Sequence, residues 1–185
     1  MQSAAARLAP VQPACRVLYV GSGNSRLTDS RELMELFGDY DEVRLDICKE
    51  YKPDIVADMT DMGDIGQYDA VVSRHSLEHL HQENVVRALG EFLRVLVPGG
   101  LAVIYVPDLE GITPTDDVVY ESAAGPITGH DMFYGYAPYV ADNPYMAHHS
   151  GFTEKRLTTI MENAGFAQVI VKRAWYLQLL AVGVK

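Results

Sequence analysis

The sequence has few basic residues, no long apolar run and little cysteine. Lys and Arg together number 15 against 25 Asp and Glu, and the formal net charge is −10. Proteins that hold nucleic acid by its phosphates need clustered Lys and Arg, and the sequence has no such cluster. Nucleic acid and anionic membranes are therefore disfavoured as main partners. No apolar run approaches the roughly 20 residues that cross a bilayer, so no membrane-spanning helix is expected.

Cysteine occurs only at Cys15 and Cys48, and this pair has neither a metal-binding nor a redox spacing. The simplest interpretation is two reduced thiols in a cytoplasmic protein. Residues 1–14 lack the continuous apolar core of a signal peptide and are interpreted as a flexible tail. The remaining chain, 15–185, is long enough for one substantial core and is predicted to form a single domain.

Residues 17–24 join an apolar strand to a glycine pair, and the rest of the chain is organised around them. The strand is followed at once by Gly21 and Gly23, which let the backbone turn sharply and come close to a ligand. The residues after the turn can begin a helix, whose free N–H groups attract a negatively charged or polar group. Helical spacing of apolar residues predicts this helix, which begins at Ser25 or at Asp29.

Apolar strands alternate with helical patterns along the chain, which predicts a doubly wound α/β fold with a mostly parallel sheet. Only seven residues separate Asp46 from Asp54, so the crossover helix between these two strands is shortened or missing. The last two strands are joined by a short turn and are predicted to be antiparallel. After a first strand at 16–20, strands are expected at 43–47, 54–58, 68–73, 101–106, 167–172 and 175–182, and helices through 85–96 and from Thr153 to about Asn163. The helix 85–96 is predicted to bury one face, which carries Val85, Val86, Leu89, Phe92, Leu93 and Leu96.

The segment 107–150 breaks this alternation. It is rich in Pro, Gly and Tyr, has no convincing periodicity, and is too long for a simple connection. We interpret it as an ordered lid or substrate-binding insertion. Its tyrosines either line an aromatic pocket for a flat or cationic substrate or pack the insertion onto the sheet. The tyrosines in question are Tyr120, Tyr134, Tyr136, Tyr139 and Tyr145.

Two aspartates, Asp46 and Asp58, end the second and third predicted strands. In an open parallel sheet, ligands bind at the carboxyl ends of the central strands, where these acids join Gly21 and Gly23. An acid after the second strand can accept hydrogen bonds from a ribose diol, so the combination predicts a nucleoside-containing ligand. A dinucleotide would need a third glycine where this chain has Arg26, which disfavours NAD.

In their order and spacing, several segments resemble the class I S-adenosylmethionine-dependent methyltransferases of the small-molecule branch. The resemblance covers nearly the whole chain, although Ser25 stands where that family commonly has a third glycine. Its most specific parts are the segments Leu77–Leu80 and Pro98–Gly100. The other parts are the glycine motif 17–24, Asp46, and the segments 57–59, 68–73, 149–153 and 164–166.

The resemblance implies a seven-stranded sheet whose last strand is antiparallel, and a site for S-adenosyl-L-methionine. The glycine turn would hold the methionine part of this cofactor, Asp46 its ribose, and Asp58 with Met59 its adenine. The segment Ser73–His75 would lie near the transferred methyl group. The cofactor-binding residues expected from the resemblance are Gly21, Ser22, Gly23, Asp46, Ile47, Asp58, Met59, Ser73 and Arg74.

Methyl transfer requires little covalent help from the protein, because the sulfonium is already activated. The site must align the acceptor, exclude water and, for a protonated acceptor, remove a proton. Histidine is the most suitable base near neutral pH. His75, after the fourth strand, is the first catalytic candidate, and His148 and His149 come second. For each of them, the alternative of merely ordering a loop stays open.

His75, Glu78 and His79 fall on one helical turn, a pattern that can bind a divalent metal. Some methyltransferases carry an acid-x-x-Glu-His metal motif at this place, but here the first position is a histidine. The sequence Leu-Glu-His-Leu also occurs in methyltransferases that use no metal. No metal ligand is therefore predicted from the sequence.

The leading hypothesis is transfer of a methyl group from S-adenosyl-L-methionine to an O or N atom of a small-molecule acceptor. The protein is expected to be cytoplasmic, without nucleic acid or membrane as a partner, and a homodimer is one possible state. The short crossover and Ser25 leave a non-catalytic methyltransferase-like scaffold or partner subunit as the alternative. A nicotinamide-dependent oxidoreductase is disfavoured by Arg26.

Overall fold

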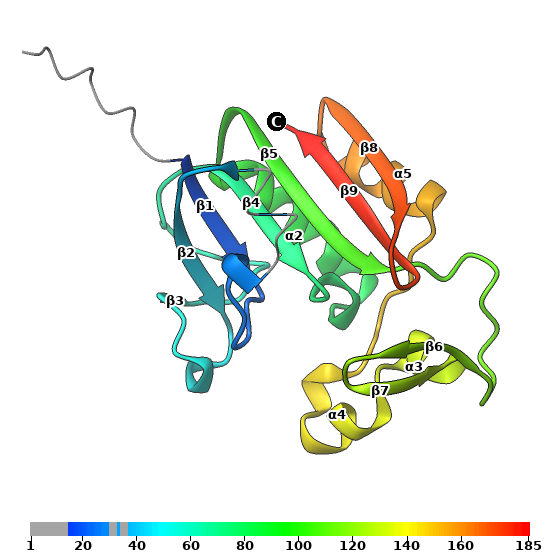
Figure 1. Cartoon of the computed structure of the whole chain (residues 1–185). Coiled ribbons are helices and arrows are strands. Elements are labelled where there is room, and N and C mark those ends of the chain that lie inside the picture. The colour runs from blue at the N-terminus through cyan, green and yellow to red at the C-terminus, as the bar shows by residue number, and fades with distance from the viewer. Residues whose placement is uncertain (1–14, 30–32, 34–36) are drawn as a thin grey trace, which may run out of the picture.

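Seven strands of the described residues form one sheet (Figure 1). The computed structural model describes residues 15–29, 33 and 37–185, and the predicted tail 1–14 lies outside them. The strand order is β3-β2-β1-β4-β5-β9-β8. The strands span Cys15–Val20 (β1), Tyr40–Asp46 (β2), Ile55–Val56 (β3), Tyr68–Arg74 (β4), Leu96–Pro107 (β5), Gln168–Ala174 (β8) and Gln178–Val184 (β9).

The sheet is parallel from β3 to β5, and β9 runs against its neighbours. Within β1, Val17, Leu18 and Val20 are fully buried, as expected for a central strand covered on both faces. The turn into β9 is tight, because Tyr176 and Leu177 adopt left-handed backbone conformations with φ of 59° and 51°. These observations confirm the predicted doubly wound, mostly parallel seven-stranded sheet with an antiparallel last strand.

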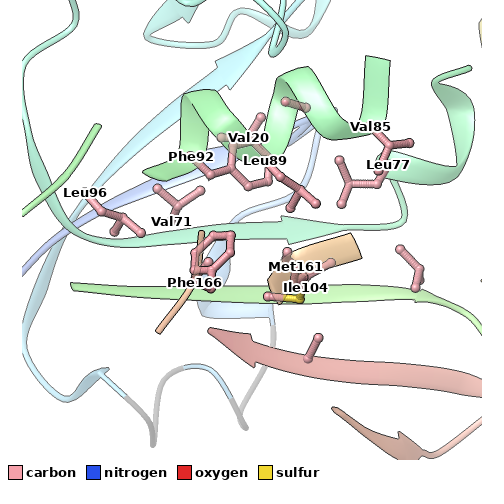
Figure 2. Close-up of a cluster of buried hydrophobic side chains, with 14 of the residues drawn as sticks. Val20, Val71, Leu77, Val85, Leu89, Phe92, Leu96, Ile104, Met161 and Phe166 are labelled. Carbon is pink, nitrogen blue, oxygen red and sulfur yellow. The ribbon is translucent and has the colours of Figure 1, made fainter. Parts of the chain in front are cut away.

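Two helices, α2 (Gln82–Val95) and α5 (Glu154–Ala164), cover one face of the sheet (Figures 1 and 2). Their apolar sides share one buried cluster with β4 and β5. Within it, Leu89 and Phe92 are fully buried, which contributes about 1.5–3 kcal/mol each. Val86 is 49% exposed, although the sequence placed it on the buried face. The reason is the helical period of about 3.6 residues, which turns it away from its buried neighbour.

The ends of α5 agree with the sequence, whereas the end of α2 does not. The hydroxyl of Thr153 accepts the N–H of Arg156 at 3.3 Å, and Gly165 ends α5 with φ of 109°. By contrast, α2 ends at Val95, and Leu96, expected on the buried side of that helix, begins β5. The Val-Pro pair that follows explains this early end, because a residue before proline avoids helical dihedrals.

The opposite face of the sheet carries a second buried cluster, formed by β1, β4, β5 and Leu27 among others. Leu27–Asp29 form a single 3-10 turn, η1, directly after the glycine turn. The rest of the helix predicted to follow that turn falls largely on residues 30–32 and 34–36, which lie outside the described part of the chain.

The connection between β2 and β3 contains a short 3-10 helix, η2 (Lys49–Tyr51), in place of a full crossover helix. This confirms the predicted shortening. The strand β3 is itself shorter than the predicted stretch 54–58. Its two flanking acids are engaged elsewhere: Asp54 accepts the backbone N–H of Arg44 at 2.8 Å, and Asp58 accepts hydrogen bonds from the threonine two residues on.

The insertion between β5 and α5 is ordered around a hairpin. Its two ends meet where Asp108 forms a bridge with Phe152. It lies on the side towards which β4 and β5 run, near the carboxyl ends of the parallel strands (Figure 1). Within the described part of the chain, no helix has both the length and the apolar character needed to cross a membrane. The insertion consists of β6 (Val118–Ser122), β7 (Gly125–Thr128), α3 (Gly129–Tyr134), α4 (Ala137–Asp142) and the 3-10 helix η4 (Pro144–Met146).

Candidate active site

The glycine turn packs the end of β1 against the segment that follows β4. Gly21 has φ of +64°, and its N–H and that of Ser22 donate to the carbonyl of Leu45 at 2.9 and 3.3 Å. A Cβ at Gly21 would lie 2.5 Å from the Cβ of Ser76 and 3.4 Å from the Cε of Met59. Only glycine fits this position without movement of its neighbours. The turn therefore lies directly against the segment after β4.

Asp46 ties the glycine turn to the end of β2. Its carboxylate is 7% exposed and accepts the N–H of Gly23 at 2.7 Å and that of Cys48 at 2.8 Å. A carboxylate has about four acceptor positions, so about two of them are left for a ligand. The next side chain, Ile47, is apolar and 61% exposed. This pairing of an acid with an open apolar surface suits a ribose diol that carries a flat base.

Arg44 takes part in the site, although no motif points to it. Arg44 belongs to β2 and its side chain is buried, with 6% of the residue exposed. Its guanidinium donates hydrogen bonds to the carbonyl of Gly23 and to the carbonyls of Tyr51 and Lys52, the latter two at 3.2 and 3.4 Å. It therefore fastens the glycine turn to the connection after β2. The only signal in the sequence is an arginine between two apolar residues of a buried strand.

The other predicted cofactor residues do not all converge on the glycine turn. Asp58 is exposed, and its carboxylate accepts hydrogen bonds from the backbone N–H and the hydroxyl of Thr60 in the turn that follows. Ser73 is fully buried, and its hydroxyl lies 2.6 Å from that of Ser76, which it supports against the glycine turn. The guanidinium of Arg74 lies over the ring of Tyr105, 5.5 Å from the ring centre.

A cavity of about 240 Å³, called here the central cavity, lies between the end of β4 and the insertion. It is next to the glycine turn in the fold, because Ser76, which packs against that turn, directly follows the cavity residue His75. Neither of the two described cavities is itself lined by Gly21, Gly23 or Asp46. Of the five insertion tyrosines, Tyr120, Tyr136 and Tyr139 line the central cavity, whereas Tyr134 and Tyr145 do not.

The three candidate histidines are divided between two cavities. His75 and His148 both line the central cavity. His149 lines a separate cavity of about 270 Å³ with Arg156, and its ring stacks on that of His81 at 4.3 Å. The backbone N–H of His149 donates at 2.7 Å to the carbonyl of Glu78, which fastens the end of the insertion to the 3-10 helix after β4.

His75 occupies an unusual backbone conformation. Its φ of +48° is rare for a residue with a side chain, and such conformations cluster at functional sites. The conformation is held by the N–H of His75, which donates to the carbonyl of Tyr105 at 2.9 Å. One ring nitrogen, Nε2, lies 3.0 Å from Oε1 of Gln178, and the other, Nδ1, lies 3.4 Å from a carboxylate oxygen of Glu78.

Glu78 places a buried negative charge beside the central cavity. Burial alone would raise the pKa of Glu78, but its histidine neighbours His75, His79 and His148 outweigh this effect, and the pKa lies below its usual range. Burial lowers the pKa of His148. Near neutral pH the cavity therefore contains a carboxylate beside a neutral imidazole, which can accept a proton. Glu78 belongs to a segment that the sequence singled out, but its burial was not evident there.

Residues 18–104 match the sequence profile of a family described as "Methyltransferase domain". Over these residues the sequence is similar to a methyltransferase domain, and the strand order of the whole sheet is that of the class I methyltransferase fold. Among curated proteins, none is significantly similar to the chain.

Solved structures of methyltransferases have the same fold as this domain. An S-adenosylmethionine-dependent methyltransferase from Mesorhizobium loti aligns with 16% identity and a TM-score of 0.62, over 93% of this chain and 91% of that chain. The 1,6-didemethyltoxoflavin-N1-methyltransferase of Burkholderia thailandensis, solved with 1,6-didemethyltoxoflavin and S-adenosylhomocysteine, aligns with 17% identity and a TM-score of 0.61, over 93% and 71%. Human N-acetylserotonin methyltransferase in complex with SAM aligns with 12% identity and a TM-score of 0.62, over 92% and 47%. The chain spans about half the length of several such methyltransferases.

The residues of this methyltransferase domain fit S-adenosylmethionine chemically. Asp46 keeps free acceptor positions for a ribose diol, and the exposed face of Ile47 beside it suits a flat base. At Gly23, no atom lies within 4 Å of the place that a Cβ would take, so the turn leaves open space beside Asp46.

Proposed function

We propose that this protein transfers a methyl group from S-adenosyl-L-methionine to an O or N atom of a small-molecule acceptor. The observation that carries the proposal is the link between the glycine turn and Asp46, at the carboxyl ends of β1 and β2. This is the edge where open parallel sheets bind ligands. The family match over residues 18–104 supports the same reaction class.

The two parts of the site, the glycine turn with Asp46 and the central cavity, have different proposed roles. S-adenosylmethionine supplies a methyl group already activated on a sulfonium. Asp46 accepts hydrogen bonds from the ribose, and the glycine turn approaches the amino-acid part. The acceptor occupies the central cavity, where His75 is the first candidate to remove a proton and His148 the second. His149 has weaker support, because it lines the other cavity.

We propose that the chain from 15 to 185 acts as one domain and that the segment 107–150 is the lid over the acceptor. Three tyrosines of this segment line the central cavity, which favours an aromatic or cationic acceptor. A homodimer and a cytoplasmic location stay predictions, which light scattering and cell fractionation test. The acceptor itself is found by incubating the protein and labelled cofactor with a metabolite extract and identifying the methylated product by mass spectrometry.

Calorimetry with S-adenosylhomocysteine tests the cofactor site directly. We expect Asp46→Asn to weaken binding by about 10-fold to 100-fold, because hydrogen bonds to a charged group contribute roughly 1.5–3 kcal/mol. The amide keeps one acceptor for the glycine turn, so thermal unfolding is measured in parallel to separate binding from stability. The matched control is Asp41→Asn, which removes an exposed acid at the other end of the same strand and should bind normally.

The alternative role, a non-catalytic scaffold, predicts a different result. The N–H groups of Gly21, Ser22 and Gly23 already bind the protein itself, and such a closed turn also suits a scaffold. If the folded protein does not bind S-adenosylhomocysteine, or if Asp46→Asn binds it as tightly as the wild type, the methyltransferase proposal is wrong.

A further inference from the structure

Three side chains beside the central cavity converge on one point. Glu78 and His79 come from the 3-10 helix η3 (Leu77–His79), and His148 comes from the end of the insertion. One ligand atom from each lies within 4.8 Å of the ligand atoms of the other two. A carboxylate with two imidazoles is a donor set that binds divalent first-row transition metals. The arrangement arises only in the fold, because His148 is far from Glu78 in the sequence.

The protonation of both histidines favours metal binding. Nδ1 of His79 lies 3.1 Å from the carbonyl oxygen of Ala147, and Nδ1 of His148 lies 3.0 Å from that of Met132. A carbonyl oxygen can only accept, so each Nδ1 carries a proton, and in the neutral ring each Nε2 keeps a free lone pair. Metal-binding histidines almost always have such a backbone or carboxylate partner on the other ring nitrogen. Both imidazoles are therefore held in the tautomer that a metal requires.

Glu78 provides the independent sign that a cation belongs here. Its side chain is 1% exposed, and neither carboxylate oxygen has a hydrogen-bond partner among the described residues. One carboxylate oxygen lies 3.4 Å from Nδ1 of His75, which is close enough for an ion pair but does not have the geometry of a hydrogen bond. Leaving a buried carboxylate without hydrogen bonds costs several kcal/mol unless a cation compensates it. A proton on one of the neighbouring histidines or a metal ion can do so.

We propose that Glu78, His79 and His148 bind one divalent transition-metal ion of the Zn²⁺, Mn²⁺, Co²⁺ or Fe²⁺ class. Mg²⁺ and Ca²⁺ are disfavoured, because they take oxygen ligands and two of these three donors are nitrogen. A metal ion balances the charge of Glu78 and uses both free Nε2 lone pairs, whereas a proton on one of the neighbouring histidines uses at most one of them.

The ion borders the central cavity, which the same three residues line. Its remaining coordination positions can therefore bind an oxygen of the acceptor, and this consequence rests on the proposed methyl transfer. A hydroxyl bound to such an ion loses its proton more readily. Among the candidate acceptors, those with a hydroxyl group next to the methylated position are then preferred.

Metal binding is measured on the full chain without cofactor, so it is independent of methyl transfer. Chelator-treated protein is titrated with Zn²⁺ and with Co²⁺ by calorimetry, and the visible absorption of Co²⁺ reports nitrogen ligands. We expect one ion per chain, and at least about 10-fold weaker binding in Glu78→Gln and in His148→Asn, since even outer partners of a metal site contribute that much. The matched control is His81→Asn, an exposed histidine close in sequence but outside the cluster, which should bind the metal normally.

The proposal is wrong if the folded wild type binds neither ion in a one-to-one ratio, or if both variants bind as tightly as the wild type. Circular dichroism shows whether each variant is folded, and if Glu78→Gln is not, His148→Asn decides alone. Binding of S-adenosylhomocysteine is measured on the same metal-free protein. If the protein binds S-adenosylhomocysteine but no metal, the proposed function stands and the proposed metal site is wrong. If it binds a metal but no S-adenosylhomocysteine, the metal site stands and the proposed function is wrong.

Discussion

Gly21 and Gly23 belong to the same turn but are needed for different reasons. Both have positive φ, of 64° and 52°, which costs a residue with a side chain roughly 1–2 kcal/mol. At Gly21, a Cβ would also meet the Cβ of Ser76 at 2.5 Å, whereas at Gly23 it would point into open space. Gly23 is therefore required only for its backbone conformation. Gly21 is required both for its backbone conformation and for its close packing against Ser76.

This difference predicts the stabilities of two alanine variants. Gly23→Ala should lose about 1–2 kcal/mol of unfolding free energy, the cost of the left-handed backbone alone. Gly21→Ala should lose more, by about 1–3 kcal/mol, because the turn must also move away from Ser76. Urea unfolding of both variants measures the difference. Equal losses would show that Ser76 moves aside freely and that the contact is not restrictive.

At the scale of elements, the insertion depends on one capping box. The hydroxyl of Thr128 accepts the N–H of Asp131 at 3.1 Å, and the Asp131 carboxylate accepts the N–H and hydroxyl of Thr128 at 2.9 and 2.6 Å. The same carboxylate accepts the N–H of Ala137 at 3.0 Å and so joins α3 to α4. Burial would raise the pKa of Asp131, but these hydrogen bonds outweigh it and lower the pKa.

A lowered pKa fixes the direction of the pH dependence. The stabilisation by Asp131 is complete above the ordinary aspartate pKa of about 3.9 and is lost as pH falls through the lower folded pKa. At pH 7, Asp131→Asn should cost about 1 kcal/mol, typical of a lost cap. That difference should shrink as pH falls below about 4, because the carboxyl of the unfolded chain takes up a proton first and that of the folded protein follows at its lower pKa. Urea unfolding at several pH values measures it, with exposed Asp142→Asn as control, and a pH-independent difference would contradict the assignment.

Local signals in the sequence predicted the ends of some elements and not of others. Thr153 and Gly165 delimit α5 as expected, because caps act through adjacent backbone groups. Leu96 fits the period of α2 but belongs to β5, since its backbone pairs with Tyr68 of β4. A helical period cannot reveal such pairing, because it depends on a strand far along the chain.

At the scale of the whole molecule, Asp108 joins the base of the insertion to the antiparallel edge of the sheet. It is 2% exposed and pairs with the guanidinium of Arg173 in β8. Its backbone N–H donates to the carbonyl of Leu177 at 2.8 Å, and its carboxylate accepts the N–H of Glu110 at 2.9 Å. The start of the insertion is therefore fixed against the last hairpin.

Removing one member of this pair should cost more than removing both. Arg173→Met leaves a buried carboxylate without its cation and should lose about 2 kcal/mol, less than a fully buried pair because the arginine is half exposed. Adding Asp108→Asn removes the uncompensated charge, so the double variant should recover part of the loss. A double-mutant cycle in urea tests this, and strictly additive losses would mean that the pair does not interact.

The sequence by itself determined the parallel sheet, the glycine turn and the acid after β2, because these follow from residue type, period and spacing over short stretches. It also pointed to His75 and to the segment around Glu78. Only the tertiary structure decided that His148 lies beside Glu78 and His79 while His149 faces another cavity. That choice depends on how the insertion folds back onto the end of β4, a long-range contact that no local pattern of residues encodes.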